Sequence, residues 1–101
     1  MLVLKNRETM LSWFDPVYLW IEKMKTTQYF DYTRKRPDRA KIKEDWIKYV
    51  IDNPVKIEIQ SDGRIRKWAE ILEVGKYLRV ILLEDGETVH NAFFDRSYKE
   101  K

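Results

Sequence analysis

The sequence predicts a small α+β domain in which two helices pack on one face of an antiparallel β-meander of four to five strands. Three observations lead to this fold class. The chain has 101 residues, a length typical of one domain. Apolar residues recur at helical spacing in its first half and alternate with polar residues in its second half. Asp62-Gly63 and Asp85-Gly86 divide the alternating half into hairpins.

The composition is that of a folded protein without metal or thiol chemistry. Hydrophobic residues make up 44% of the chain, whereas Gly and Pro number only three each, which separates it from disordered chains. The 20 basic and 17 acidic residues leave a net charge of +3, so the distribution of charge matters more than its sum. Cys is absent and His90 is the only histidine, so we expect no disulfide, metal or cofactor. No apolar run is long enough to span a membrane, and we expect a soluble cytoplasmic protein.

We treat residues 1–101 as a single domain with an N-terminal aromatic helix segment, residues 1–28, and a core, residues 29–98. Asp15 and Pro16 are typical of a helix N-cap and first turn, and they predict a helix over about residues 16–26. Apolar side chains extend around much of this helix. Either both of its sides pack on the domain, or part of it contacts a partner chain, such as the second copy of a homodimer. The residues that would make that contact are Trp13, Phe14, Tyr18 and Leu19.

Positive charge concentrates ahead of the second helix. Residues 34–43 contain six basic side chains and one carboxylate. We expect residues 31–36 to be extended and Pro37 to begin the approach to a helix, which Asn53 and Pro54 end. The broad apolar face of that helix carries Ile42, Trp46, Ile47, Val50 and Ile51.

Three turns determine the expected register of the strands. Residues 61–63 are typical of a three-residue loop, residues 73–76 of a four-residue loop, and Asp85-Gly86 of a two-residue type I′ loop. Because side chains alternate between the faces of a sheet, these loops also decide which residues share a face. The expected cross-strand pairs are Gln60 with Arg64, Glu58 with Arg66, Ile57 with Lys67, Trp68 with Ile81, Glu70 with Arg79, Leu82 with Val89, Val80 with Asn91, and Leu78 with Phe93.

This register places Val89 and Phe93 on the side of the helices, together with Lys67, the one charged misfit. A basic and aromatic set occupies the opposite face. Guanidinium groups hold phosphates and aromatic rings stack on unpaired bases, so this set indicates nucleic-acid binding. The alternative is structural, because Glu58 and Glu70 are ordinary cross-strand partners for arginines. The expected nucleic-acid-binding residues on this face are Arg64, Arg66, Trp68 and Tyr77, and Arg79, His90, Ala92 and Phe94 share the face with them. Arg34, Arg36 and Arg39 of the basic stretch complete the expected nucleic-acid-binding set.

His90 is the candidate for proton transfer. Its ordinary pKa of about 6.5 suits general acid or base chemistry at a phosphodiester. Arg79 lies diagonally across the expected hairpin, close enough for both side chains to meet one phosphate. The alternative is a partly buried histidine whose ring only forms hydrogen bonds within the domain.

The stretches RPDRAKIKEDWIKYVIDNP, DGRIRKW, YLRVILLEDG and TVHNAFFDR follow one another within residues 29–98. Over this range the chain resembles small bacterial domains of the RelE/ParE-like group, part of the barnase–EndoU–colicin–RelE fold group. Many members of that group are ribonuclease toxins of toxin–antitoxin pairs. Relatives commonly carry a histidine and arginines just before the central helix, whereas this chain has Tyr32, Thr33, Arg34 and Arg36 there.

The resemblance implies a metal-independent ribonuclease toxin that acts on RNA, free or on the ribosome, and is bound by an antitoxin protein. Arg36 or Arg39, with Arg79, would hold the scissile phosphate. His90 or Tyr32 would move the proton while the RNA 2′-OH attacks. A second hypothesis is a non-catalytic module that binds nucleic acid or an acidic protein through the same surface, and a third is a structural subunit of a larger assembly. Fold alone does not decide between these functions.

Overall fold

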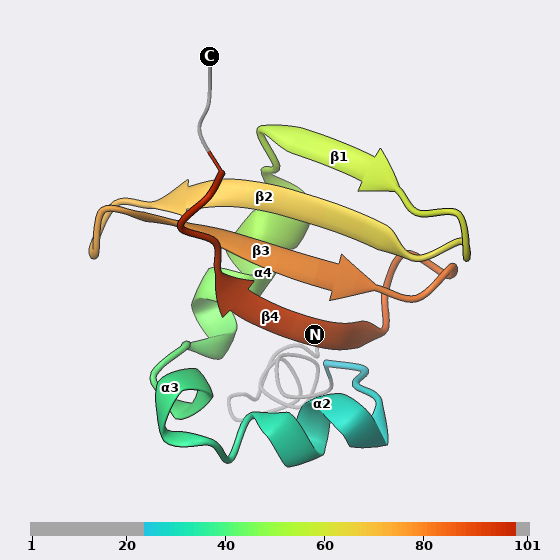
Figure 1. Cartoon of the computed structure of the whole chain (residues 1–101), viewed down its shortest axis with the longest axis horizontal. Coiled ribbons are helices and arrows are strands. Elements are labelled where there is room, and N and C mark those ends of the chain that lie inside the picture. The colour runs from blue at the N-terminus through green and yellow to red at the C-terminus, as the bar shows by residue number, and fades with distance from the viewer. Residues whose placement is uncertain (1–23, 99–101) are drawn as a thin grey trace, which may run out of the picture.

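A four-stranded antiparallel sheet is the centre of the computed structural model, which describes residues 24–98 of the chain (Figure 1). The strands lie in chain order, β1-β2-β3-β4, so the sheet is a meander and this part of the chain has the predicted α+β fold class. The elements are α2 (Gln28–Thr33), α3 (Pro37–Ala40), α4 (Glu44–Asp52), β1 (Lys56–Ile59), β2 (Ile65–Ile71), β3 (Lys76–Leu82) and β4 (Val89–Phe94).

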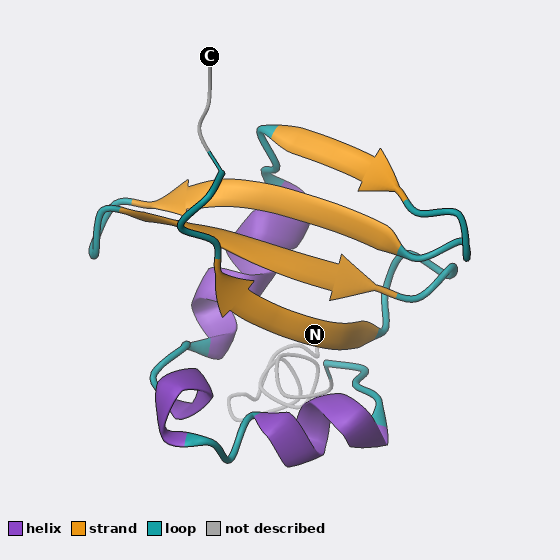
Figure 2. Ribbon diagram, in the orientation of Figure 1, coloured by secondary structure: helices purple, strands orange, loops and turns teal. Residues whose placement is uncertain are grey.

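The two faces of the sheet have different neighbours (Figure 2). α4 packs against β2 and β3 on one face, which we call the inner face. The segment that follows β4 crosses the opposite, outer face, where the ring of Tyr98 stacks on Trp68. The core lies on the inner face, and each of its large side chains contributes about 1.5–3 kcal/mol by burial. Its most deeply buried members are Ile47, Val50, Leu78, Val80, Leu82 and Val89.

α4 has the apolar face and the end that the sequence predicts. Ile47 and Val50 are fully buried, and Trp46 and Ile51 pack beside them. Asn53 is the C-cap residue, and Pro54 follows it. Acidic residues occupy the first turn, where the free backbone N–H groups favour negative charge. Ile42 precedes the helix and is buried in the same core.

α2 occupies part of the segment 31–36, so the prediction that this segment is extended is wrong. Thr27 caps the helix, because its hydroxyl accepts a hydrogen bond from the Phe30 N–H at 3.1 Å. Phe30 and Thr33 are buried, and α2 contacts β4. A six-residue helix is not stable in isolation, so tertiary burial of this face determines its conformation.

Only the end of the expected N-terminal helix lies within the described residues, and that part is extended rather than helical. The Thr27 N–H donates to the Val89 carbonyl at 3.0 Å, and the Val89 N–H donates to the Lys25 carbonyl at 2.9 Å. These hydrogen bonds to β4 replace hydrogen bonds within a helix. The prediction that the helix extends to residue 26 is therefore wrong for its last residues. The expected helical residues 16–23 lie outside the described part of the chain. The same is true of the expected contact residues Trp13, Phe14, Tyr18 and Leu19.

The β1–β2 hairpin has the predicted register. Ile57 pairs with Lys67 and Glu58 with Arg66, and Gln60 and Arg64 close the hairpin. Gly63 adopts a φ of 91° in the connecting loop, a conformation that favours glycine. The structure also explains the misfit Lys67, whose ammonium group donates to the Ile51 carbonyl in the last turn of α4 at 2.9 Å. This contact satisfies a carbonyl that the helix leaves without an intrahelical partner.

The β2–β3 pairing differs from the prediction by two residues. Trp68 lies opposite Arg79 and Glu70 opposite Tyr77, rather than opposite Ile81 and Arg79 respectively. The loop closes at Gly75, whose φ is 63°, and two backbone N–H groups of the loop donate to the Ile71 carbonyl. A shift of two residues keeps every side chain on its predicted face, so Arg66, Trp68, Tyr77 and Arg79 do share the outer face.

The predicted β3–β4 register is correct only for the pair next to the turn. Leu82 pairs with Val89 as expected, but Ile81 then pairs with Asn91, so His90 is an extra residue in a β-bulge. The prediction of a two-residue loop is also wrong. The Gly86 N–H donates to the Leu83 carbonyl, and the four residues 84–87 form the connection. Val80 faces Ala92 and Leu78 faces Phe94, rather than Asn91 and Phe93.

The bulge exchanges the faces of the residues that follow it. Ala92 is buried and Phe94 packs on the core, with its ring 6.0 Å from that of Trp46. Phe93 and Asn91 therefore lie on the outer face. The physical reason is the spacing of the apolar residues Val89, Ala92 and Phe94, which a regular strand cannot place on one face but a strand with one extra residue can.

Candidate nucleic-acid interface

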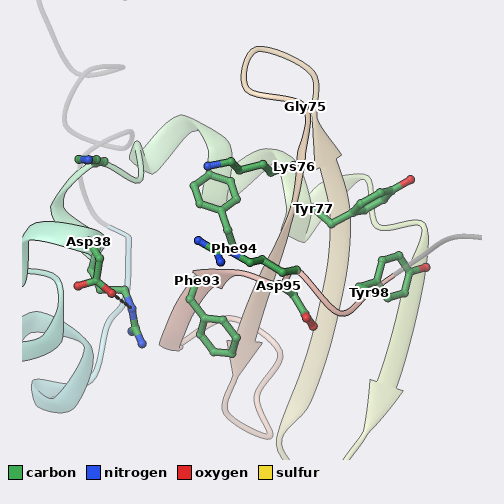
Figure 3. Close-up of a pocket in the computed structure, with 11 residues that line it drawn as sticks. Asp38, Gly75, Lys76, Tyr77, Phe93, Phe94, Asp95 and Tyr98 are labelled. Carbon is green, nitrogen blue, oxygen red and sulfur yellow. Dashed lines mark ion pairs between the residues drawn. The ribbon is translucent and has the colours of Figure 1, made fainter.

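A surface hollow of about 710 Å³ lies where α3 meets the start of β3 and the end of β4. Figure 3 shows Asp38 of α3 on one side of it and Tyr77 and Tyr98 on the other. Phe93, Phe94 and Asp95 lie between them, and Lys76 also lines the hollow. The hollow is therefore built from three segments of the chain, residues 38–41, 75–77 and 93–98, which only the tertiary fold brings together.

A row of alternating cations and aromatic rings crosses the outer face and ends at this hollow. Lys56, Trp68, Arg79 and Phe93 are successive cross-strand neighbours from β1 to β4. The Lys56 ammonium lies 5.8 Å from the Trp68 ring centroid. The Arg79 guanidinium lies 5.3 Å from the Trp68 centroid and 4.9 Å from that of Phe93, and Arg39 reaches from α3 to 5.2 Å from Phe93. All four distances are within the range of cation–π attraction.

Arg39 lines the hollow with its guanidinium held on three sides. Its Nη1 donates to the Asn91 side-chain oxygen at 2.7 Å, and its Nε lies 3.6 Å from the Asp38 carboxylate. The Phe93 ring lies against the same group. A guanidinium has five N–H donors in a planar fork. These contacts therefore fix its orientation and leave other N–H groups free to donate to a phosphate.

Arg79 is bound by a buried carboxylate. Its Nη2 and Nε donate to one oxygen of Asp95, and the Trp68 indole N–H donates to the same oxygen at 3.0 Å. The other oxygen accepts the Ser97 N–H and hydroxyl. Burial opposes ionisation of this carboxyl, but the hydrogen bonds from these three partners and the charge of Arg79 lower the pKa of Asp95. Arg79 is therefore neutralised by its partner and positions the neighbouring ring.

The lining of the hollow has more positive than negative charge. Four cations stand against two carboxylates, an excess of two positive charges that attracts anions. The aromatic members add flat surfaces on which a base can stack. The cations are Arg39, Lys41, Lys76 and Arg96, the carboxylates are Asp38 and Asp95, and the aromatic residues are Tyr77, Phe93, Phe94 and Tyr98.

His90 lies near the start of β4, whereas the hollow lies at the end of this strand. Its Nδ1 is 3.1 Å from the Thr27 hydroxyl, and its ring stacks on that of Tyr29 with centroids 4.9 Å apart. Burial lowers the pKa of His90, and the charge of Arg64 lowers it further. Because Arg79 faces Phe93 instead of a neighbour of the histidine, the expected juxtaposition of His90 and Arg79 is wrong.

Three further residues expected in a catalytic or binding role lie outside the lining of the hollow. Tyr32 is exposed on α2, and Arg34 at the end of that helix forms an ion pair with Glu44 at 2.9 Å. Arg36 precedes α3, and its Nε lies 3.7 Å from the Asp38 carboxylate. Asp38 thus links Arg36 to the edge of the hollow without bringing it inside.

The arginines at the other end of the outer face have local acidic partners. Arg66 lies opposite Glu58, with 3.4 Å between Nη1 and Oε1, which is the charge pair that the structural alternative expects. Arg64 lies 3.7 Å from the Asp62 carboxylate. Trp68 is only 4% exposed beneath Tyr98, so its ring offers no free surface to a base.

Several residues of the hollow were not identified from the sequence. Phe93 had been assigned to the inner face, and the signal that was missed is the apolar spacing in VHNAFF that requires a bulge. Lys76 and Arg96 adjoin strand ends and belong to no periodic pattern. Lys41 was recognised only as part of the basic stretch. These side chains meet Arg39 because α3 lies beside β4 in the folded domain.

Fold and site together define a small α+β domain with a basic, aromatic-lined hollow at one end of its sheet. No protein-family model, curated protein or solved structure matches the chain. The resemblance to the RelE/ParE-like group therefore stays a prediction from the sequence motifs. Between residues 24 and 98, no helix is both long and apolar enough to cross a membrane.

Proposed function

We propose that the protein binds single-stranded RNA in the hollow between α3, the start of β3 and the end of β4. One observation carries this proposal: the Arg39 guanidinium lies 5.2 Å from the centroid of the Phe93 ring at the wall of the hollow, while Arg79, paired with Asp95, packs against the same ring. Positive charge beside an aromatic surface matches a nucleotide, which joins an anionic phosphate to a flat base.

The roles of the side chains follow from their exposure and partners. Arg39 supports phosphate binding, since contacts with Asn91 and Phe93 orient its fork in advance. Lys76 is exposed at the rim and adds a flexible second charge. Arg79 acts as a positioning residue, because Asp95 neutralises its charge while its guanidinium packs on Phe93.

A single strand suits the hollow better than a duplex does. Reading a DNA duplex usually requires a helix or a two-stranded ribbon in the major groove. Among the described helices, α2 and α3 have only six and four residues, and α4 has its apolar face against the sheet. Unpaired bases can instead enter a hollow and stack on its rings. RNA rather than DNA is expected from the resemblance to RNA-cleaving toxins.

Binding requires no proton transfer, and His90 is separated from the hollow by the length of β4. The ribonuclease hypothesis differs, because it requires the protein to cut RNA in the absence of metal. One experiment distinguishes binding from cleavage: the protein is mixed with a fluorescently labelled, random-sequence RNA of about 20 nucleotides in EDTA. Fluorescence anisotropy reports binding, and a denaturing gel of the same samples reports cleavage.

We expect the full chain to bind this RNA with an affinity whose logarithm falls linearly with the logarithm of salt concentration, because phosphate contacts release counterions. Lys76→Gln should weaken binding several-fold and reduce the salt slope by about 0.7 for single-stranded RNA. Phe93→Leu should weaken binding roughly 5- to 100-fold if one base stacks on the ring. A DNA strand of the same sequence and an RNA duplex serve as competitors.

Lys25→Gln is the matched control, because it removes an exposed lysine that pairs with Glu87 far along β4 from the hollow. It should leave the affinity within about twofold. Equal losses for Lys25→Gln and Lys76→Gln would show diffuse attraction without a site, and an affinity independent of salt would exclude the proposal. Cleavage that disappears in His90→Ala would favour the ribonuclease hypothesis instead.

A further inference from the structure

One edge of β1, the edge away from β2, has no neighbouring strand among the described residues. β1 ends the sheet and pairs only with β2. At the other end of the sheet, the backbone of residues 25–27 forms hydrogen bonds with Val89 and so covers the start of β4. Natural proteins usually cover an edge strand or disrupt it, since its free N–H and C=O groups can pair with another chain.

The register identifies which backbone groups of β1 point outward. The Gln60 N–H donates to the Arg64 carbonyl at 2.7 Å, so these two residues form a hydrogen-bonded pair of the antiparallel ladder. Such pairs alternate with non-bonded ones, which makes Glu58 the next residue bonded to β2. At the start of the strand, the Val55 N–H donates to the Trp68 carbonyl at 2.8 Å. The N–H and C=O groups of Ile57 and Ile59 therefore face the free edge.

Apolar side chains accompany these free groups. Ile57 is 54% exposed and Ile59 is 73% exposed, on the inner face of the sheet. The contacts of α4 concentrate on β2 and β3, so the helix leaves these side chains uncovered. Val55, just before the strand, is exposed as well. Burying such a row against an identical row removes apolar surface from water without any change in the core.

The charges on the other face of β1 select the partner and the register. Lys56 and Glu58 flank Ile57 and form an ion pair within one copy, with 3.2 Å between Nζ and Oε2, and Glu58 also pairs with Arg66. A two-fold axis at Ile57 would place Lys56 of one copy opposite Glu58 of the other, twice, so that this pairing extends across the edge. Moving the axis to Glu58 or to Lys56 would set like charges opposite each other, which is destabilising. An axis at Ile59 would also pair outward backbone groups, but it would place Glu58 opposite Gln60. The axis at Ile57 pairs the outward groups and also sets opposite charges against each other.

We infer that two copies of this chain associate through antiparallel pairing of their β1 strands about a two-fold axis at Ile57, which forms one continuous eight-stranded sheet. In this dimer, Val55, Ile57 and Ile59 of both copies form a single apolar stripe on the inner face. The inference is independent of RNA binding, because β1 and the hollow lie at different edges of the sheet.

Sedimentation velocity of the full chain between about 1 μM and 1 mM tests the inference, since this range covers weak and strong association. We expect a concentration-dependent species of twice the chain mass. Ile57→Lys places two ammonium groups together on the axis and should raise the dimer dissociation constant at least about tenfold. Leu72→Lys is the matched control, because Leu72 is 82% exposed in the β2–β3 loop, away from the β1 edge.

A pair of charge reversals tests the register. Lys56→Glu alone and Glu58→Lys alone should each weaken the dimer, because each sets like charges opposite one another across the axis. An equimolar mixture of the two variants should regain dimer, because opposite charges then meet between unlike copies. Circular dichroism of each variant verifies folding. A chain that is monomeric up to about 1 mM, or a dimer that Ile57→Lys leaves unchanged, would overturn the inference.

Discussion

Arg79 donates two hydrogen bonds to a single carboxylate oxygen of Asp95, from Nη2 at 2.7 Å and from Nε at 3.1 Å. The indole of Trp68 donates a third to the same oxygen. These contacts connect β2 and β3 to the segment after β4, over the outer face of the sheet. The arginine that the sequence suggested as a phosphate ligand is thus a structural support for the aromatic wall of the hollow.

Asp95→Asn should lower the free energy of unfolding by about 2–3 kcal/mol. Breaking a buried ion pair costs about 3–5 kcal/mol, and we reduce this figure because the Arg79 side chain is 22% exposed. Urea denaturation at pH 7 measures the change. Asp62→Asn is the control, because that carboxylate is exposed and lies 3.7 Å from its arginine. It should alter stability by less than about 0.5 kcal/mol, and an equal effect of both substitutions would contradict the assigned role of Asp95.

Stability should fall in acid, partly through Asp95. Its pKa is lowered in the folded state, so the folded chain binds this proton less readily than the unfolded chain does. The contribution is complete above the unfolded pKa of about 3.9 and is lost as the pH falls toward the lowered folded value. Urea midpoints between pH 7 and pH 2 should therefore decline less steeply in Asp95→Asn. Parallel declines in the variant and the wild type would show that the carboxyl is not stabilised in its charged form.

His90 should titrate below the ordinary histidine pKa of about 6.5, as measured by NMR of its imidazole protons. Burial is the main cause, and two nearby charges act in opposite directions. Arg64→Gln should raise the pKa, whereas Asp62→Asn should lower it further. Because the folded state favours the neutral ring, its stabilising contribution is complete above about pH 6.5 and is lost as the pH falls through the lowered value. A titration above 6.5 would contradict the burial of this ring.

The bulge at His90 makes a sharp prediction about neighbouring positions of β4. Ala92→Asp puts a carboxylate into the core beside Val80 and should cost about 3–5 kcal/mol or prevent folding. Asn91→Asp is the control, because its side chain faces outward and accepts a hydrogen bond from Arg39. It should leave stability nearly unchanged or slightly increased in thermal unfolding. Tolerance of Ala92→Asp would support the regular hairpin that we expected from the sequence.

Local patterns predicted the parts of the fold that depend on local chemistry. The apolar spacing from Ile42 to Ile51 and the Asn53-Pro54 stop located α4. Alternation and the three-residue loop gave the β1–β2 register correctly. The β2–β3 loop was placed one residue too late, which changes the pairing register by two residues, yet every face assignment was correct because the side-chain period in a strand is also two.

The candidate site was predicted less well than the fold. Arg39, Tyr77 and Arg79 were identified as functional residues, and they do line or support the hollow. Lys41 and Lys76 were not identified as site residues, and Phe93 was placed on the wrong face. The pair Leu82–Val89 next to the turn was predicted correctly, but the one extra residue at His90 reverses the face of every side chain after it, so the error extends to the end of the strand.

By itself, the sequence determined the fold class, the apolar face and the end of α4, the first hairpin and the faces of β2 and β3. Each of these depends on interactions between residues close in the chain or on a repeating side-chain period. Only the tertiary structure decided that α2 is helical, that His90 is bulged, that Asp95 binds Arg79, and that α3 borders a hollow. These features arise where distant segments compete for the same buried surface and the same backbone hydrogen bonds, and no local pattern records the outcome of that competition.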